Sequence, residues 1–176
     1  MVGAVSQRFA TLQRLDEDKS YAIRQLMIQK GLRLFQQSPI IGVGAGRWVE
    51  ESVPLDIPRV FSYAPQSHFD VKTSHNSYVS FLAENGLLGA IPLTVLLMIL
   101  TLRGLRSSIL LTRQGELWAL GFYAGFVAMS VHLWAFSGLT NTATWLIYGL
   151  VAATIQLSQQ DREENGNRNA TQTRAL

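Results

Sequence analysis

The residues of this chain whose types could carry chemistry are a histidine, an asparagine and a glutamate within ten positions. His75 and Asn76 stand together, and Glu84 follows in the same polar segment. Histidine has an ordinary pKa near neutrality, so His75 could take a proton from a substrate hydroxyl as a general base. Asn76 and Glu84 could bind the substrate. For Glu84, nine residues from His75, a simple helix-end carboxylate remains an equal alternative.

The element that must position these residues is an apolar helix that follows them. Between Glu84 and Arg103 lie 18 residues without a charge, mostly leucine, isoleucine, valine and methionine. At about 1.5 Å per residue, such a helix covers most of the ~30 Å hydrocarbon core of a bilayer. The spacing predicts chemistry on a substrate held at the membrane surface, because His75 precedes the helix by about three turns.

A second apolar region predicts two more membrane helices. Between Glu116 and Asp161 lie 44 residues without a charged side chain, enough for helices over 117–136 and 139–157. We therefore expect an all-α integral membrane protein with about three transmembrane helices over 86–157, preceded by a large, partly helical extracytoplasmic loop over 20–85. Residues 158–176 are almost devoid of large apolar side chains, which predicts a disordered tail.

The segment before the histidine has helix and turn signals. Ser20 is a suitable N-cap for a helix from Tyr21 to about Gln37, which Pro39 would end. Glycines at 42, 44 and 46 predict a tight turn or a close backbone approach, and residues 49–74 predict an irregular loop. Residues 1–19 are expected to be the end of a preceding helix and a charged link.

Charge and composition exclude several classes of protein. The chain has 176 residues and a net charge of +3 that is too dispersed for nucleic-acid binding, and it has no cysteine for a disulfide or thiolate metal site. No cluster of acidic or histidine residues indicates a bound metal, and no cofactor is expected. The connection 103–116 has three arginines against one glutamate, which predicts that it is cytoplasmic. The His75 loop would then face outward, and the C-terminus inward.

The motifs around His75 resemble those of the O-antigen ligase family. His75-Asn76, nine further residues and then the GLLG of residues 86–89 match that family's histidine signature. The flanking AENGLLG and the upstream SPIIGVGAG are also similar to its C-terminal region. The resemblance covers roughly residues 20–157.

The resemblance implies a multi-pass glycosyltransferase of the bacterial inner membrane with a periplasmic His75 loop. Such enzymes transfer a glycan from an undecaprenyl diphosphate carrier to the hydroxyl of a lipid or glycan acceptor without a metal. It implies His75 as the catalytic histidine and Arg24 as an arginine that faces the lipid diphosphate. The family's second arginine has no match here, and its earlier membrane helices are absent, so we expect a C-terminal fragment or a shortened member.

Other functions remain open at this stage. A ligase, a polymerase and a protein O-glycosylating enzyme would share the signature. A membrane transporter or uptake accessory protein is a second class, and an inactive fragment that packs against partner helices is a third. Transporters tend to have broken helices or buried charges at the bilayer midplane, and His132 is the one ionisable residue inside the expected spans.

Overall fold

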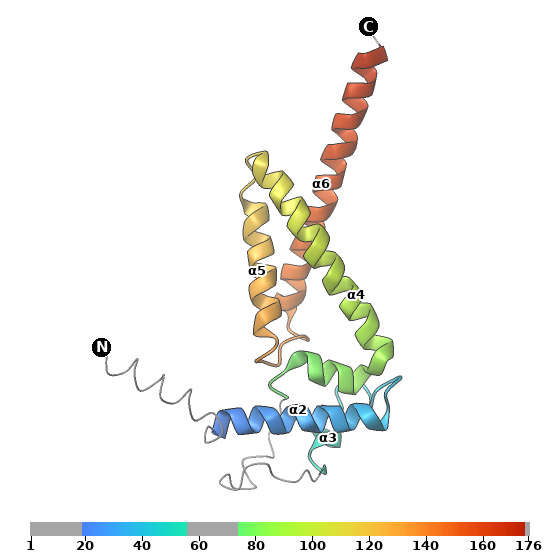
Figure 1. Ribbon diagram of the computed structural model, residues 1–176, viewed down its shortest axis with the longest axis vertical. Helices are drawn as coiled ribbons and strands as arrows, with labels where there is room; N and C mark the ends of the chain where they lie inside the picture. The colour runs from blue at the N-terminus through green and yellow to red at the C-terminus, as the bar shows by residue number, and fades with distance from the viewer. Residues whose placement is uncertain (1–18, 56–73, 175–176) are drawn as a thin grey trace, which may run out of the picture. The chain divides into compact units, whose positions relative to one another are not determined.

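A computed structural model describes residues 19–55 and 74–174, in which every regular element is a helix (Figure 1). The all-α prediction is confirmed for these residues. They form two compact units, each described by itself. The first contains the described residues up to Ala90 together with Trp134–Ser137, and the second contains Ile91–Leu133 and the described residues from Gly138 onward.

The first unit is built on α2 (Lys19–Gln37), the helix that the sequence predicts over Tyr21–Gln37. Apolar residues recur on one side of it, because positions three or four apart lie on the same face of a helix. Met27 and Leu34 are fully buried there against Trp48 of α3 (Trp48–Ser52) and Ala83 of α4 (Ser77–Arg113). The short helix α3 lies where the sequence predicted only irregular loop, and most of that loop, residues 56–73, lies outside the described residues.

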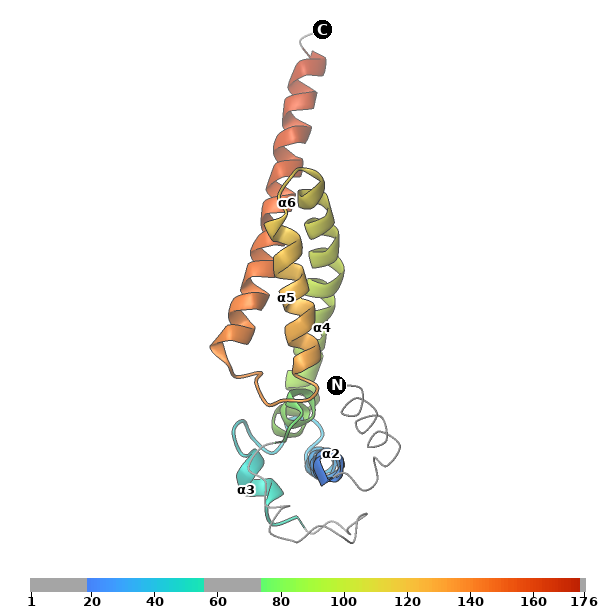
Figure 2. The same ribbon diagram turned by 90° about the vertical axis from the view of Figure 1, so that its left-hand side faces the viewer.

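The long helix α4 (Ser77–Arg113) contains the predicted apolar span and is broken at Gly86. Among the described residues it is the one helix that is long and apolar enough to cross a membrane. We refer to residues 77–85, before the break, as the first segment of α4. This segment and α2 lie side by side in the first unit (Figures 1 and 2).

The sequence predicted a connection between helices at 103–116, but most of these residues belong to α4. The end of this helix is therefore corrected to Arg113. Arginine and leucine favour helix, so α4 continues through them to Arg113. The glycine that stops the helix is Gly115, two residues later, with a φ of 99°. The amide of Gly115 donates to Thr112 O at 3.0 Å, and the amide of Glu116 donates to Leu111 O at 3.0 Å. This pair of hydrogen bonds is the glycine C-cap known as a Schellman motif.

The second unit joins the rest of α4 to α5 (Trp118–His132) and α6 (Thr142–Arg174). Phe126 of α5 and Tyr148 of α6 meet edge to face with ring centroids 5.1 Å apart, and Ser130 hydrogen-bonds the Tyr148 hydroxyl at 3.2 Å. The 15 residues of α5 reach about 22 Å, short of the ~30 Å core, so the predicted helix over 117–136 is too long. The number of spans stays a prediction.

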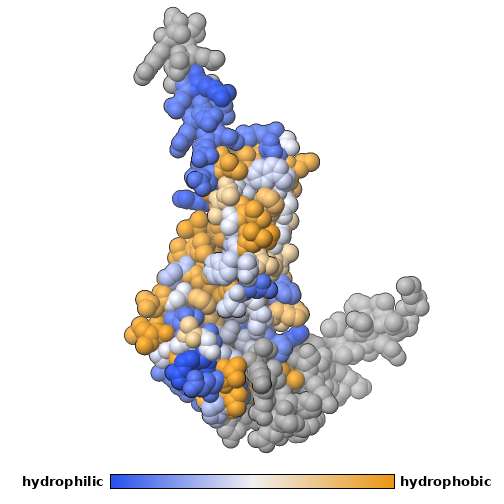
Figure 3. Space-filling view, turned by 180° about the vertical axis from the view of Figure 1, so that it is seen from behind, coloured by the Kyte–Doolittle hydropathy of each residue, from blue (hydrophilic) through white to orange (hydrophobic). Residues whose placement is uncertain are grey.

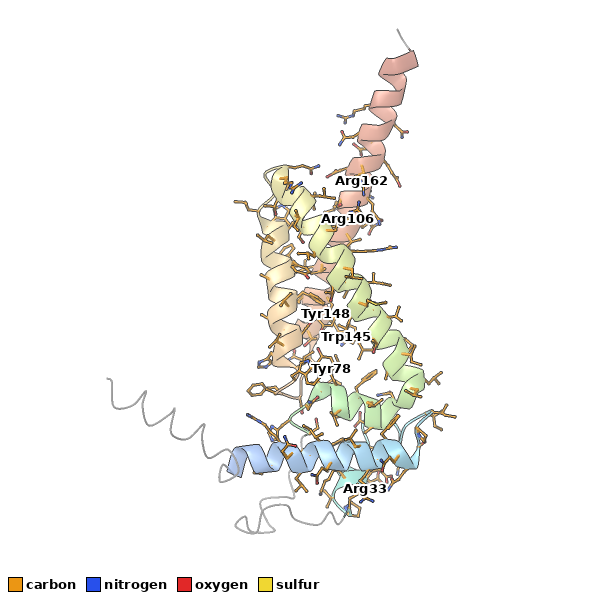
Figure 4. All side chains as sticks on the ribbon, viewed as in Figure 1. Arg33, Tyr78, Arg106, Trp145, Tyr148 and Arg162 are labelled. Carbon is orange, nitrogen blue, oxygen red and sulfur yellow. The ribbon has the colours of Figure 1, made fainter. Side chains whose placement is uncertain are left out.

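The expected disordered tail over 158–176 differs from the structure, because α6 continues to Arg174. Glutamine, glutamate and arginine favour helix, and extending a formed helix is easier than starting one. Glu164 and Arg168, one turn apart, also pair at 3.6 Å. Arg106 of α4 and Arg162 of α6 lie toward the same end of the second unit (Figure 4).

Candidate functional site

His75 lies in a left-handed backbone turn immediately before α4. Its φ is 49°, and the described part of the chain has no other non-glycine residue with a positive φ. For a residue with a Cβ this conformation costs roughly 1–2 kcal/mol, and such strain is concentrated at functional sites. The His75 side chain is half-buried and has contacts of its own.

The residues on either side of His75 hold this turn in place. The Ser74 hydroxyl donates to the Asn76 carbonyl at 2.9 Å and accepts from the Asn76 amide at 3.3 Å. The Asn76 Oδ1 atom accepts from the amides of Tyr78 and Val79, both at 3.1 Å. Asn76 is therefore the N-cap of α4, a role that an asparagine before a helix could have indicated from sequence. Its predicted contact with substrate stays a prediction.

A segment distant in sequence fixes the same turn from outside. Ser74 and Ser137 share a hydrogen bond at 3.2 Å between their hydroxyls, and Ser77 donates to Phe136 O at 2.7 Å. The Tyr78 ring (labelled in Figure 4) lies 5.4 Å from the Trp134 ring, centroid to centroid. Sequence reasoning missed this contact, because no local pattern relates residues about 60 positions apart.

The glycine turn predicted at residues 42–46 docks onto the break in α4. The amides of Val43 and Gly44 donate to the carbonyls of Ala83 and Glu84 at 3.0 and 2.9 Å. The amides of Leu87 and Leu88 donate back to Pro39 O and Ile40 O, both at 2.9 Å. We call residues 39–44 and 83–88 together the junction. It satisfies four of the backbone groups that a broken helix leaves without partners within the helix.

Two glycines make the junction possible. Gly86 has a φ of 58° and Gly42 a φ of 73°. A Cβ on Gly86 would overlap backbone atoms of Gly42 and Ile40, and a Cβ on Gly42 would overlap the Glu84 backbone. The sequence predicted a turn at Gly42 correctly. Gly86 is the first residue of the GLLG motif, and its close contact is with the backbone of this loop.

Glu84 links the junction to α3. Its Oε1 atom accepts a hydrogen bond from the Trp48 amide at 2.9 Å, at the first residue of α3. About 12 Å of helix separate Glu84 from Asn76, so the structure does not bring Glu84 to His75. One carboxylate oxygen thus has a structural partner, and acceptor binding by Glu84 stays a prediction.

A charged group follows the glycine turn. Arg47 pairs with Glu50 at 3.1 Å and with Glu51 at 2.6 Å. The hydrogen bond and the charge of Glu50 raise the pKa of Arg47, and Arg47 in turn lowers the pKa of Glu50. The charges of the exposed Arg47 and Glu50 and the half-buried Glu51 are therefore satisfied by one another.

Arg24 lies at the His75 end of the first unit. Gly31 of α2 faces Val79, and Leu87 N donates to Pro39 O just after α2. Both contacts join residues 48 positions apart. Because the offset stays constant, α2 and the first segment of α4 run parallel. Arg24 precedes Gly31 by two turns, which puts it on the same face of α2, while His75 precedes Val79 by about one turn. The Arg24 side chain is exposed.

Arg33 offers a contrast on the same helix. It is also exposed, but lies two residues after Gly31 and therefore on the opposite side of α2. Figure 4 shows it on the side away from the first segment of α4. Within the described residues no group of three or more histidine, aspartate or glutamate side chains could hold a metal ion, and metal independence stays a prediction.

Comparison with known proteins identifies one family. A family model described as O-antigen ligase matches residues 1–94, which is 94 of the 176 residues. The match includes α2, the junction, α3, His75 and the start of α4. No curated protein and no solved structure matches the chain.

Proposed function

This chain belongs to the O-antigen ligase family, and from that membership we propose that it transfers a lipid-linked glycan to an acceptor hydroxyl at the membrane surface. The family supports a membrane enzyme of polysaccharide biosynthesis, in the bacterial inner membrane. The observation that carries the finer proposal is the strained turn at His75, which lies inside the matched region and is held by Ser74 and Asn76.

In the proposed reaction His75 acts as the base. It takes the proton of the acceptor hydroxyl as that oxygen bonds to the anomeric carbon of the donor glycan. The bond from this carbon to the carrier diphosphate breaks, and the lipid diphosphate leaves with the electron pair. A diphosphate is a good leaving group, so the enzyme must supply a base and stabilise the charge on the phosphates.

Arg24 is proposed to bind the diphosphate. Arginine is always charged, and its planar fork matches two phosphate oxygens. Its exposed position on the α4-facing side of α2, at the His75 end, supports this role. We propose undecaprenyl diphosphate as the carrier and a lipid or glycan as the acceptor, on the periplasmic face of a multi-pass protein.

The rigid turn explains why the base would be effective. A general base must lie within hydrogen-bond reach of the proton it removes, so its backbone has to be fixed. The two hydrogen bonds between Ser74 and Asn76 close a ring around His75, and Ser137 ties that ring to the segment before α6.

The test is to place His75→Ala in the chromosomal gene and measure glycan transfer in isolated membranes. We expect a loss of roughly 10²–10⁴-fold in turnover with binding of the lipid-linked donor retained, the usual contribution of a positioned base. Equal amounts of protein in the membrane must be confirmed by immunoblot. Near-normal transfer by His75→Ala would refute the mechanism.

Arg24 and Arg33 form a matched pair for the second half of the test. Arg24→Ala should weaken donor binding as well as turnover, while Arg33→Ala on the opposite side of α2 should change neither. Arg24→Lys should restore only part of the binding, because a point charge cannot replace a bidentate fork. Equal effects of the Arg24 and Arg33 substitutions would exclude a specific diphosphate contact.

A further inference from the structure

Four aliphatic side chains form an exposed patch on the junction that the proposed chemistry does not use. Ile40, Ile41, Leu87 and Leu88 are 68%, 65%, 44% and 69% exposed. The hydrogen bonds from Leu87 to Pro39 and from Leu88 to Ile40 hold the two pairs next to each other. Single exposed aliphatic residues are common on proteins, but a contiguous group indicates an interaction surface. We call these four residues the junction patch.

The junction patch leads directly into the apolar part of α4. Ile91, Met98 and Leu102 further along this helix are 58%, 53% and 65% exposed. They belong to the one described helix that could cross a membrane, and its apolar stretch is largely exposed in the chain. Lipid chains are the natural neighbours of such side chains. In sequence, the patch is therefore followed at once by exposed apolar side chains of the kind that lipid accommodates.

Polar and charged residues flank the loop part of the patch in the sequence. Gln36 and Gln37 precede it and are exposed, and the charged group of Arg47, Glu50 and Glu51 follows it. Figure 3 shows hydrophobic surface beside strongly hydrophilic surface at this corner of the molecule. An apolar face with a charged border is the pattern of a segment lying at a membrane interface.

The backbone of the junction also suits a lipid environment. A broken helix in contact with lipid is tolerated only if its freed amides and carbonyls are satisfied within the protein. Ala83 O, Glu84 O, Leu87 N and Leu88 N all have backbone partners in the loop of residues 39–44. The break at Gly86 therefore leaves none of these four groups in need of water.

We propose that the junction patch inserts among the acyl chains of the outer leaflet, so that residues 39–44 and the break at Gly86 lie at the boundary of lipid and water. The inserted patch sets the depth of the first segment of α4, and with it the level at which His75 meets a substrate. This proposal depends on the membrane location of the family and not on the chemistry of His75, so the two can fail separately.

Spin labels at single cysteines test the proposal directly, since the chain has no cysteine of its own. Labels at Ile41→Cys and Leu88→Cys would be compared with labels at Gln36→Cys and Glu50→Cys on the polar border. The full chain is placed in phosphatidylethanolamine–phosphatidylglycerol vesicles without a polyprenyl donor. Collisions with oxygen, which concentrates in lipid, and with a nickel chelate, which stays in water, are then measured.

We expect the labels at Ile41 and Leu88 to collide more with oxygen than with nickel, and those at Gln36 and Glu50 to show the reverse. Because no polyprenyl lipid is present, oxygen contact identifies the bilayer itself. Higher nickel than oxygen collision at the patch would overturn the proposal. So would protection from both reagents, because another protein surface would then cover the patch. Ile40→Cys replaces Ile41→Cys if circular dichroism shows a loss of helix.

Discussion

At His75 the chain holds a backbone conformation that glycine adopts more easily than any other residue. The cost is compensated by neighbours, because Ser74 and Asn76 bond each other across the histidine. The sequence indicated His75 by its residue type and its motif. It could not indicate the left-handed φ, since this depends on hydrogen bonds to the cap and on Ser137, far along the chain.

His75→Gly should separate folding from activity. Alanine at a φ of 49° carries about 1–2 kcal/mol of strain from its Cβ. Glycine avoids this strain but loses more conformational entropy on folding, about 0.5–1 kcal/mol, so the glycine variant should be favoured by up to about 1.5 kcal/mol. Unfolding followed by circular dichroism in detergent should rank His75→Gly at or above His75→Ala, and both variants should lose transfer by the same roughly 10²–10⁴-fold. A glycine variant clearly less stable than the alanine variant would contradict the left-handed turn.

Asn76 should behave as a helix cap whatever else it binds. Asn76→Ala removes the acceptor of the Tyr78 and Val79 amides, which should cost about 0.5–2 kcal/mol. Hydrogen exchange at these two amides should accelerate by roughly 2–30-fold, if that energy protects them. Asn76→Asp keeps the oxygen acceptor and should remain near the parent rate. Equal acceleration in both variants would mean that the side-chain oxygen is not the cap.

Among the elements, the sequence predicted best where one helix has a clear period and a clear end. The end of α2 at Gln37 followed from its apolar spacing and Pro39, and the apolar stretch of α4 followed from its missing charges. The predicted start of α2 was wrong, because Ser20, the predicted N-cap, lies inside the helix. The sequence predicted the glycine turn of the junction but not its contact with the break in α4. The glycines at 42, 44 and 46 predicted a turn, but the contact between Gly42 and Gly86 joins segments about 45 residues apart and has no local signature.

Gly86→Ala should be among the most damaging small substitutions in the chain. The new Cβ would meet backbone atoms of Gly42 and Ile40, which cannot move aside as a side chain could, and its φ of 58° is strained. We expect a loss of at least about 1–3 kcal/mol in unfolding free energy. Gly121→Ala in α5 is the control, because nothing lies near its Cβ. If the two variants unfolded alike, the junction would not contribute to stability.

At the scale of the whole molecule, topology depends on charge more than on any contact. The arginines at 103, 106 and 113 lie at the end of α4 and predict a cytoplasmic position for the turn after it. Three spans would put residue 60 and the α5–α6 connection outside. The count could not be derived from hydropathy alone, because α5 is short and α6 runs on as a polar helix.

Single cysteines at Gln114, Thr140 and Asn165 would establish that topology. In intact spheroplasts a membrane-impermeant maleimide should label Thr140→Cys, and label Gln114→Cys and Asn165→Cys only after permeabilisation. All three positions are exposed, so a failure to react cannot be attributed to burial in the protein. Labelling of Gln114→Cys from outside would reverse the orientation and remove His75 from the periplasmic face.

The junction also imposes an order on biosynthesis. Residues 39–44 leave the ribosome well before residues 83–88, which supply the partners of their backbone. The turn at His75 lies between these two segments and is tied in addition to Ser137, synthesised later still. The site is therefore completed only after α4 and α5 have been made. A nascent chain arrested before that point would carry the motif without its geometry, which keeps the proposed base inactive until the surrounding helices are in place.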